Sequence, residues 1–542
     1  MKYLLTGAAA IAMLTACGNK DKPVDQADTE IVIDAANDIT LREGDPATAP
    51  QALTALSLDG SSSGRVSFGG SKLNGDTAVF TDVLLRAPED DDDDEDAFSD
   101  GDLKAGKIEF TGLAMVNGQP SFSRMLISDV TTTPSESEDA RQNSVSVASV
   151  DLVNPSPEVA AWVASLFSNE DPGDLPEGDA LSFDLWSMDN LQVVIDEEDG
   201  EAGTYGMETV FVSGMKDQKA ARMLLHGMTF DFQDPAENTN VKANLGDLDM
   251  RGFDFSVFAP EEGDDLEDSF ESGFMAGFNP KDPANPGYDS INLKDLNIDI
   301  SGANLAMAEL ISTVSHDSQG RAVKIVTDPT TLKVTAGEGE LGEQLGAQLA
   351  TLGYESVELS MASEQTYDPN ADIVTLAKGK NYWELKDGFR LDYAAKYEGA
   401  SALAAAQKDA ELDSDAPGEM LEETLENLLI HSLDLSLDDN SIVDRAFNSY
   451  AAQSGDDPQE LRNQVAGMMA MAPMMMSGSG MDMELLTEAS TALSSFITNP
   501  QTLTISLKPQ TPLKVSELAD MEDPSSLTKS SLGFSAANVA SE

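Results

Sequence analysis

Apolar residues recur at positions 1, 3, 6 and 8 of several short segments, and this spacing restricts the fold more than any other feature of the chain. A β-strand alternates its two faces with period 2, so a step of three turns the side chains over unless the backbone bends or an extra residue bulges out. Gly112, Gly252 and Asp295 lie in that step, and these residue types suit a bulge or a tight bend. The segments are Ile108, Phe110, Leu113 and Met115; Leu248, Met250, Phe253 and Phe255; Ile291, Leu293, Leu296 and Ile298; and, as a variant, Leu225, Met228, Phe230 and Phe232.

The pattern predicts strands that bend while keeping one apolar face toward a core. Further strands are expected at 65–68 and 78–80, and apolar residues at helical spacing predict helices over 157–167, 303–314 and 341–352. We therefore expect an α+β, β-rich fold, in which a curved, mainly antiparallel sheet carries short helical insertions and ends in a helical and β module.

The chain divides by composition into five segments. We expect a signal peptide over 1–16, a lipid anchor and polar tether over 17–50, a β-rich body with acidic loops over 51–408, an α+β C-terminal module over 409–520 and a loose tail over 521–542. In the module, helices are expected over 419–430 and from Asp457, an N-cap followed by Pro458 and Glu460. Asn499 and Pro500 should end a helix, and strands are expected at 433–437 and 503–507.

The first residues have the layout of an export signal. Lys2 precedes an apolar run over 4–14, which is shorter than the roughly 20 residues that a membrane helix needs. Leu14-Thr15-Ala16-Cys17 resembles the lipobox of bacterial lipoproteins, and Cys17 is the single cysteine of the chain. The resemblance implies that Cys17 is acylated and anchors the protein, and Gly18, in place of a retaining aspartate, favours the outer membrane. The alternative is a free cysteine after an ordinary signal peptide.

The charge excludes one large class of function. The chain has 97 acidic and 32 basic residues, a net charge of −65, and such a field repels nucleic acid. Because 41% of the residues are apolar, we expect a folded body, and a salt-rich habitat would account for the acidic excess. The eight carboxylates of 89–96 predict a solvated loop that could at most bind calcium loosely.

Catalytic motifs are present only in part. Ser62 lies in G-x-S-x-G, but a strand-like segment follows where the nucleophile elbow needs a helix, and His226, His316 and His431 lie in no stretch that marks a base. Residues 337–342 match G-x-G-x-x-G, but Glu338 and Glu340 would oppose a pyrophosphate. We therefore predict no enzyme, no cofactor and no nucleic-acid partner.

The segment 467–483, GMMAMAPMMMSGSGMDM, is the most unusual part of the sequence. Met468, Met471 and Met475 share one helical face, which either packs as adaptable core or forms a forgiving apolar surface. Because thioether sulfur is a soft ligand suited to Cu(I), the three residues are also weak candidates for a copper site.

Three functions remain open at this stage. The first is a structural or protein-binding module of the cell envelope, the second a lipid-binding or lipid-carrier groove, and the third a copper or calcium binder. The strand spacing resembles that of the groove-shaped β proteins of the AsmA and LPS-transport kind, and that of uncharacterised exported proteins of Gram-negative bacteria. A bending sheet with an apolar face, together with a methionine-rich helical end, could enclose lipid tails or another hydrophobic ligand.

Overall fold

The computed structural model describes residues 39–60, 65–86, 102–133, 144–168, 176, 178–196, 202–234, 239–258, 282–404, 428–476, 480–516 and 527–540. The chain folds into two compact units. Unit 1 holds residues up to 271 together with 287–301, and unit 2 holds 272–286 together with 302–542. The stretch that we expected to form one body over 51–408 therefore contributes to both units.

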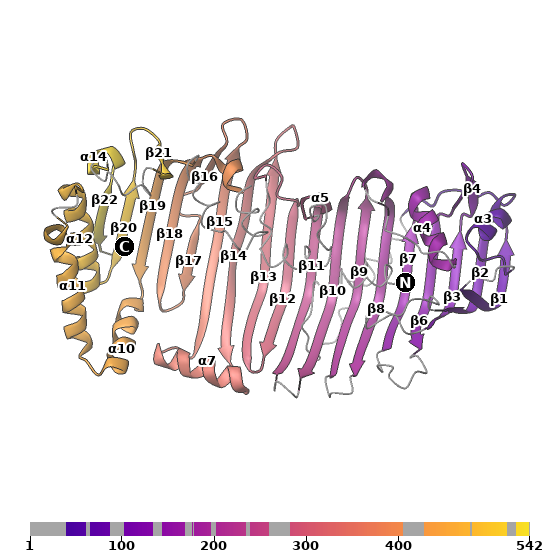
Figure 1. The fold of residues 1–542 in the computed structure, drawn as a ribbon, viewed down its shortest axis with the longest axis horizontal. Helices are drawn as coiled ribbons and strands as arrows, with labels where there is room; N and C mark the ends of the chain where they lie inside the picture. The colour runs from indigo at the N-terminus through magenta and orange to yellow at the C-terminus, as the bar shows by residue number, and fades with distance from the viewer. Residues whose placement is uncertain are drawn as a thin grey trace. The chain divides into compact units, whose positions relative to one another are not determined.

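Unit 1 is an antiparallel meander in which each strand of the main sheet pairs with the next one along the chain (Figure 1). The strands of this sheet are β1 (Val66–Asn74), β2 (Thr77–Leu85), β3 (Asp102–Thr111), β6 (Arg124–Thr133), β7 (Ser144–Val153), β8 (Phe183–Asp196), β9 (Ala202–Met215), β10 (Lys219–Asp234), β11 (Thr239–Asp254) and β12 (Ser290–Ile300). The remaining elements are α3 (Ala49–Ala55), the hairpin β4 (Ala114–Val116) and β5 (Gln119–Ser121), α4 (Pro157–Phe167), the 3-10 turn η1 (Gly178–Ala180) and α5 (Phe255–Phe258).

Two helices close the apolar core at the first strands of unit 1. The predicted helix over 157–167 is confirmed as α4, which begins at the N-cap Ser156, whose side chain accepts a hydrogen bond from the Val159 amide. Buried residues of α3 and α4 pack with buried residues of β1, β2, β3, β6 and β7 in one hydrophobic cluster. At its centre, Phe110 and Phe122 meet edge to face with their ring centroids 5.2 Å apart.

Left-handed residues form two rows across the sheet of unit 1. We call these the first and the second kink row. Strands that run in one direction contribute their positive-φ residue to the first row, and strands that run in the opposite direction contribute theirs to the second. The first kink row contains Asp82, Asp129, Asn190, Gly227 and Asp295, on β2, β6, β8, β10 and β12. The second contains Gly112 and Asn154, directly after β3 and β7, and Gly214 and Gly252, on β9 and β11.

These left-handed residues lie at the three-residue interval of the repeated apolar spacing 1, 3, 6 and 8. Gly112, Gly252 and Asp295 have φ values of 70°, 61° and 52°, so the predicted bends are confirmed. The mechanism differs from the extra-residue bulge that we considered, because the register is unchanged across the bend: Asp247 pairs with Lys294 and Asn244 with Asn297. The two neighbouring strands bend at paired positions, so their apolar side chains stay on the same face of the sheet.

Part of the segment expected as a tether belongs to the folded unit. Ile39 and Leu41 pack against a cluster of Val153, Leu185, Phe211 and Leu224. The Arg42 guanidinium donates through Nη2 to the Phe122 carbonyl at 3.1 Å, and burial lowers the pKa of this side chain. Ile39, Leu41 and Arg42, expected as part of the polar tether over 17–50, are therefore part of the fold, and residues 17–38 lie outside the described residues.

Unit 2 begins as a meander and then contains two strand positions that are each filled by two short strands. Its strands are β13 (Ala303–His316), β14 (Ala322–Ala336), β15 (Ser356–Asp368), β16 (Ile373–Leu376), β17 (Tyr382–Leu385), β18 (Phe389–Glu398), β19 (Leu429–Asp439), β20 (Thr502–Leu507), β21 (Leu513–Lys514) and β22 (Ser535–Val539). β16 and β17 both lie between β15 and β18, and β20 and β21 both pair with β19.

Asn381 joins the two short strands between β15 and β18. Its side chain is 0% exposed and donates to the Ala377 and Glu364 carbonyls at 2.7 and 3.1 Å. The amide oxygen accepts from the Glu364 amide and the Ser363 hydroxyl, both at 2.9 Å. The break between β16 and β17 therefore leaves these backbone groups of β15 paired.

The helices of unit 2 are α7 (Glu340–Thr351), α10 (Ile442–Ser454), α11 (Pro458–Met475), α12 (Met483–Thr498) and α14 (Lys529–Leu532). In Figure 1, α10, α11 and α12 gather beside β19, β20 and β22. Phe496 and Ala492 of α12 pack on Leu503 of β20. The described part of the chain contains no helix long and apolar enough to cross a membrane.

Several expectations for unit 2 need correction. Residues 303–314, expected as a helix, form β13, which pairs with β14 over most of its length. The loose tail expected after residue 520 instead includes α14 and β22, and β22 pairs with β20. Of the helix expected over 419–430, residues 419–427 lie outside the described residues, and Leu429 and Ile430 already belong to β19. The helix expected at 341–352 is confirmed as α7.

Candidate functional site

α11 begins where its capping residues predict. The Asp457 carboxylate accepts hydrogen bonds from the amides of Gln459 and Glu460 at 2.9 and 3.0 Å, and Pro458 occupies the first turn. One side of the helix is anchored, since Ala466 is buried and its carbonyl accepts a hydrogen bond from the Ser494 hydroxyl of α12 at 2.9 Å.

The other side of α11 exposes methionine to solvent. Met468, Met471 and Met475 are 49%, 52% and 77% exposed, and their i, i+3, i+7 spacing places them on one face, which we call the methionine face. Of the two interpretations left open by the sequence, adaptable core and apolar surface, the structure selects the surface. Exposed apolar side chains in a cluster mark interaction sites more often than scattered ones do.

Acidic residues outnumber basic ones in the segment that contains the methionine face. Between residues 442 and 498 the sequence has seven acidic residues, Asp444, Asp456, Asp457, Glu460, Asp482, Glu484 and Glu488, and two basic ones, Arg445 and Arg462. Arg462 forms an ion pair with Asp444, and Arg445 donates to the Leu352 carbonyl at 3.0 Å. The cations of this segment are therefore already engaged, as are two of its carboxylates, Asp444 with Arg462 and Glu488 with Lys529 of α14. The segment as a whole keeps a net negative charge.

A small apolar cavity lies in unit 1 between α4 and the sheet. It has a volume of about 100 Å³, and its wall is formed by apolar side chains of β2, β3, β6, β7, β8 and α4, among them Ile108, Met125, Val150 and Phe167. Ligand pockets usually have volumes of about 300–1,000 Å³. A whole acyl chain would therefore need the cavity to widen.

A row of polar residues follows the first kink row across neighbouring strands. Asp189 accepts hydrogen bonds from Ser149 at 2.8 Å and from Thr209 at 3.1 Å, and Thr209 is only 1% exposed. His226, paired in register with Thr209 and Asp247, contacts the Asp247 carboxylate at 2.8 Å. This hydrogen bond lowers the pKa of Asp247. These side chains form hydrogen bonds with one another next to the bend, and we assign the row a structural role.

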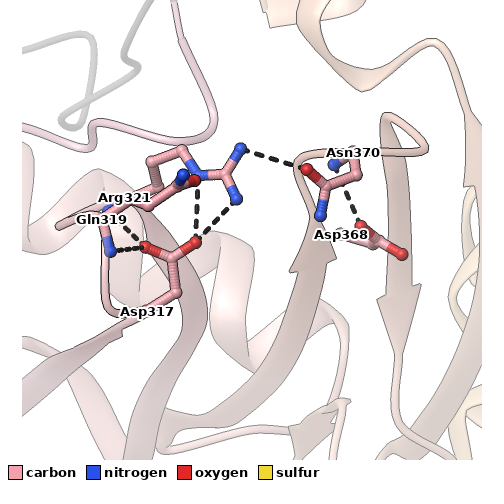
Figure 2. Close-up of polar contacts among 5 residues, drawn as sticks. All are labelled: Asp317, Gln319, Arg321, Asp368 and Asn370. Atoms are coloured by element: carbon pink, nitrogen blue, oxygen red, sulfur yellow. Dashed lines mark hydrogen bonds and ion pairs between the residues drawn. The ribbon is translucent and has the colours of Figure 1, made fainter.

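A second polar cluster joins two turns of unit 2. Asp317 accepts from the backbone amides of Gln319 and Arg321 and from the Arg321 guanidinium, whose Nη2 lies 2.8 Å away. Figure 2 shows the same guanidinium reaching from this turn toward Asn370, 3.4 Å from Nη1. Each member binds another member of the cluster, so the arrangement is a turn-to-turn connection.

Among the residues that the structure describes, the motifs singled out in the sequence do not assemble into a reactive site. Cys17, Ser62 and the acidic run over 89–96 lie outside the described residues. His226 belongs to unit 1, whereas His316 and His431 belong to unit 2, where His431 lies 3.2 Å from Glu398. Within the described ranges, no group of three or more His, Cys, Asp or Glu residues could hold a metal ion.

The glycines of G-x-G-x-x-G have a packing role. The Gly337 amide donates to the Gly302 carbonyl at 2.6 Å, and a Cβ placed on Gly342 would come within 2.6 Å of the same oxygen. Glu340 and Glu343 occupy the first turn of α7, where the helix dipole favours negative charge.

Sequence reasoning missed the polar row and the kink rows as features that cross the whole sheet. The local signal was present, since Gly, Asp or Asn recurs in the step of three, but only the strand register shows that these positions align.

Comparison with known proteins adds one partial match. A family model described as "Uncharacterized protein" matches residues 382–538, which include β17 to β20, α10, α11 and α12. The methionine face lies inside the matched region. The search of curated proteins finds no match.

Proposed function

We propose that this chain is a non-enzymatic lipoprotein of the cell envelope, anchored through Cys17, whose folded units act as a binding module for another protein. The observation that carries the proposal is the methionine face, an apolar surface on a firmly capped and packed helix. Methionine is flexible and polarizable, so such a surface adapts to a partner without a shaped pocket.

Photocross-linking in the producing cells tests the binding function. A photoreactive amino acid at Met471 is compared with the same residue at Gln453, an exposed position on α10. We expect a discrete protein adduct from position 471 and none from position 453. Equal labelling at both positions, or none at 471, would contradict the proposal.

The anchor is tested separately. Acylation of Cys17 with more than one chain would hold the protein stably on a membrane, most simply the outer membrane, because each buried methylene contributes about 0.8 kcal/mol. We expect the wild type in the detergent phase of an envelope extract and a Cys17→Ser variant in the aqueous phase. Partition of both into the aqueous phase would contradict lipid anchoring.

Lipid carriage is a second candidate, supported by the apolar wall of the cavity beneath α4. It predicts a stoichiometric lipid in an organic extract of the purified protein. A small-to-large change such as Val150→Phe would fill the cavity and remove that lipid.

A further inference from the structure

We infer that the methionine face binds a cationic amphipathic helix of a partner protein. The inference rests on the proposed function and names the chemistry of the partner. A helix partner fits because α11 presents an apolar stripe of side chains at i, i+3 and i+7, which a second amphipathic helix can match along its own apolar face.

The charge of the surroundings determines the polar face of that partner. The segment over 442–498 has seven acidic residues against two engaged arginines, and the whole chain has a net charge of −65. A helix whose polar face carries Lys or Arg would gain from this field during approach and at the rim of the contact. A helix with the same apolar face but an acidic polar face would be repelled.

A second copy of this chain is a poor occupant for the same reason. Two molecules that each carry a net charge of −65 repel one another.

The copper hypothesis requires a different chemical property of the same three methionines. Cu(I) needs the thioether sulfur, whereas a docking surface needs only an apolar side chain of similar size. Replacing Met468, Met471 and Met475 together by Leu therefore keeps the docking surface and removes the metal ligands. Replacement by Gln keeps the side-chain length and helix propensity and removes the three apolar side chains of the methionine face.

The test uses three synthetic 18-residue peptides and the full chain, with binding measured by fluorescence anisotropy in low and in moderate salt. The first peptide has Leu at helical spacing and Lys elsewhere. The second replaces each Lys by Glu, and the third is the Leu/Lys composition scrambled. We expect the Leu/Lys peptide to bind the wild type and the triple Leu variant equally, and the triple Gln variant roughly tenfold or more weakly, because about 1.4 kcal/mol of lost apolar contact is a tenfold change.

Other outcomes separate the inference from the proposed function. Binding of the Leu/Glu peptide as tightly as the Leu/Lys peptide, in a manner that requires the methionines, would overturn the cationic partner and leave the protein-binding function standing. Equal binding of the scrambled peptide, or unchanged binding to the triple Gln variant, would mean attraction to the acidic surface alone and would overturn the inference. Absence of any binding would overturn it as well, and an adduct at position 471 would then still support the proposed function.

Discussion

At the scale of single residues, the kink rows show how local stereochemistry sets the shape of a strand. The left-handed conformation costs a residue with a side chain roughly 1–2 kcal/mol, and glycine adopts it freely. In unit 1 every described left-handed position of the kink rows is Gly, Asp or Asn, the residue types that tolerate it best.

Gly227 is the sharpest place to test this. Its φ is 64°, and a Cβ there would lie 2.6 Å from side-chain atoms of Glu208. We expect Gly227→Ala to lower the free energy of unfolding by about 1–3 kcal/mol, measured by chemical denaturation. Gly467, in the interior of α11 with open space around it, is the control, and Gly467→Ala should raise stability by up to about 1 kcal/mol. The same sign for both variants would contradict the assignment of strain to Gly227.

At the scale of the element, capping fixes where α11 begins, and neighbouring carboxylates allow a clean comparison. Asp457 accepts two backbone hydrogen bonds, whereas Asp456 is an exposed acid one residue earlier. We expect Asp457→Ala to cost about 1 kcal/mol in thermal or chemical unfolding and Asp456→Ala to stay within about 0.5 kcal/mol of the wild type. Equal effects would indicate that charge, and not the cap, is responsible.

Elements with local signals were predictable from sequence. The start of α11 at Asp457 and the end of α12 before Asn499 are confirmed because capping and proline act within a few residues. β13 was predicted wrongly because Ala, Leu, Met and Glu favour helix locally, while pairing with β14 overrides that preference. Helical spacing also predicted that Met468, Met471 and Met475 share a face, but their exposure depends on how α10 and α12 pack, which no local pattern encodes.

At the scale of the whole molecule, the acidic excess opposes folding through self-repulsion. The described ion pairs engage only some carboxylates, and 97 acidic residues far outnumber 32 basic ones. We expect the melting temperature to rise by several degrees as NaCl is raised to about 0.5 M, because the Debye length then falls to only a few ångström. Sucrose at matched osmolality is the control for solvent exclusion. A melting temperature that falls with NaCl would mean that ion pairs outweigh repulsion.

The two kink rows also limit which insertions and deletions such a sheet can accept during evolution. Since each row is supplied by strands of one direction, a hairpin of two strands adds one position to both rows and leaves their alignment intact. Loss of a single residue within one strand, between the two rows, would instead shift the left-handed position of that strand out of its row and turn part of its apolar face away from the core. Length variation among related meanders should therefore occur in whole hairpins and in the turns between them.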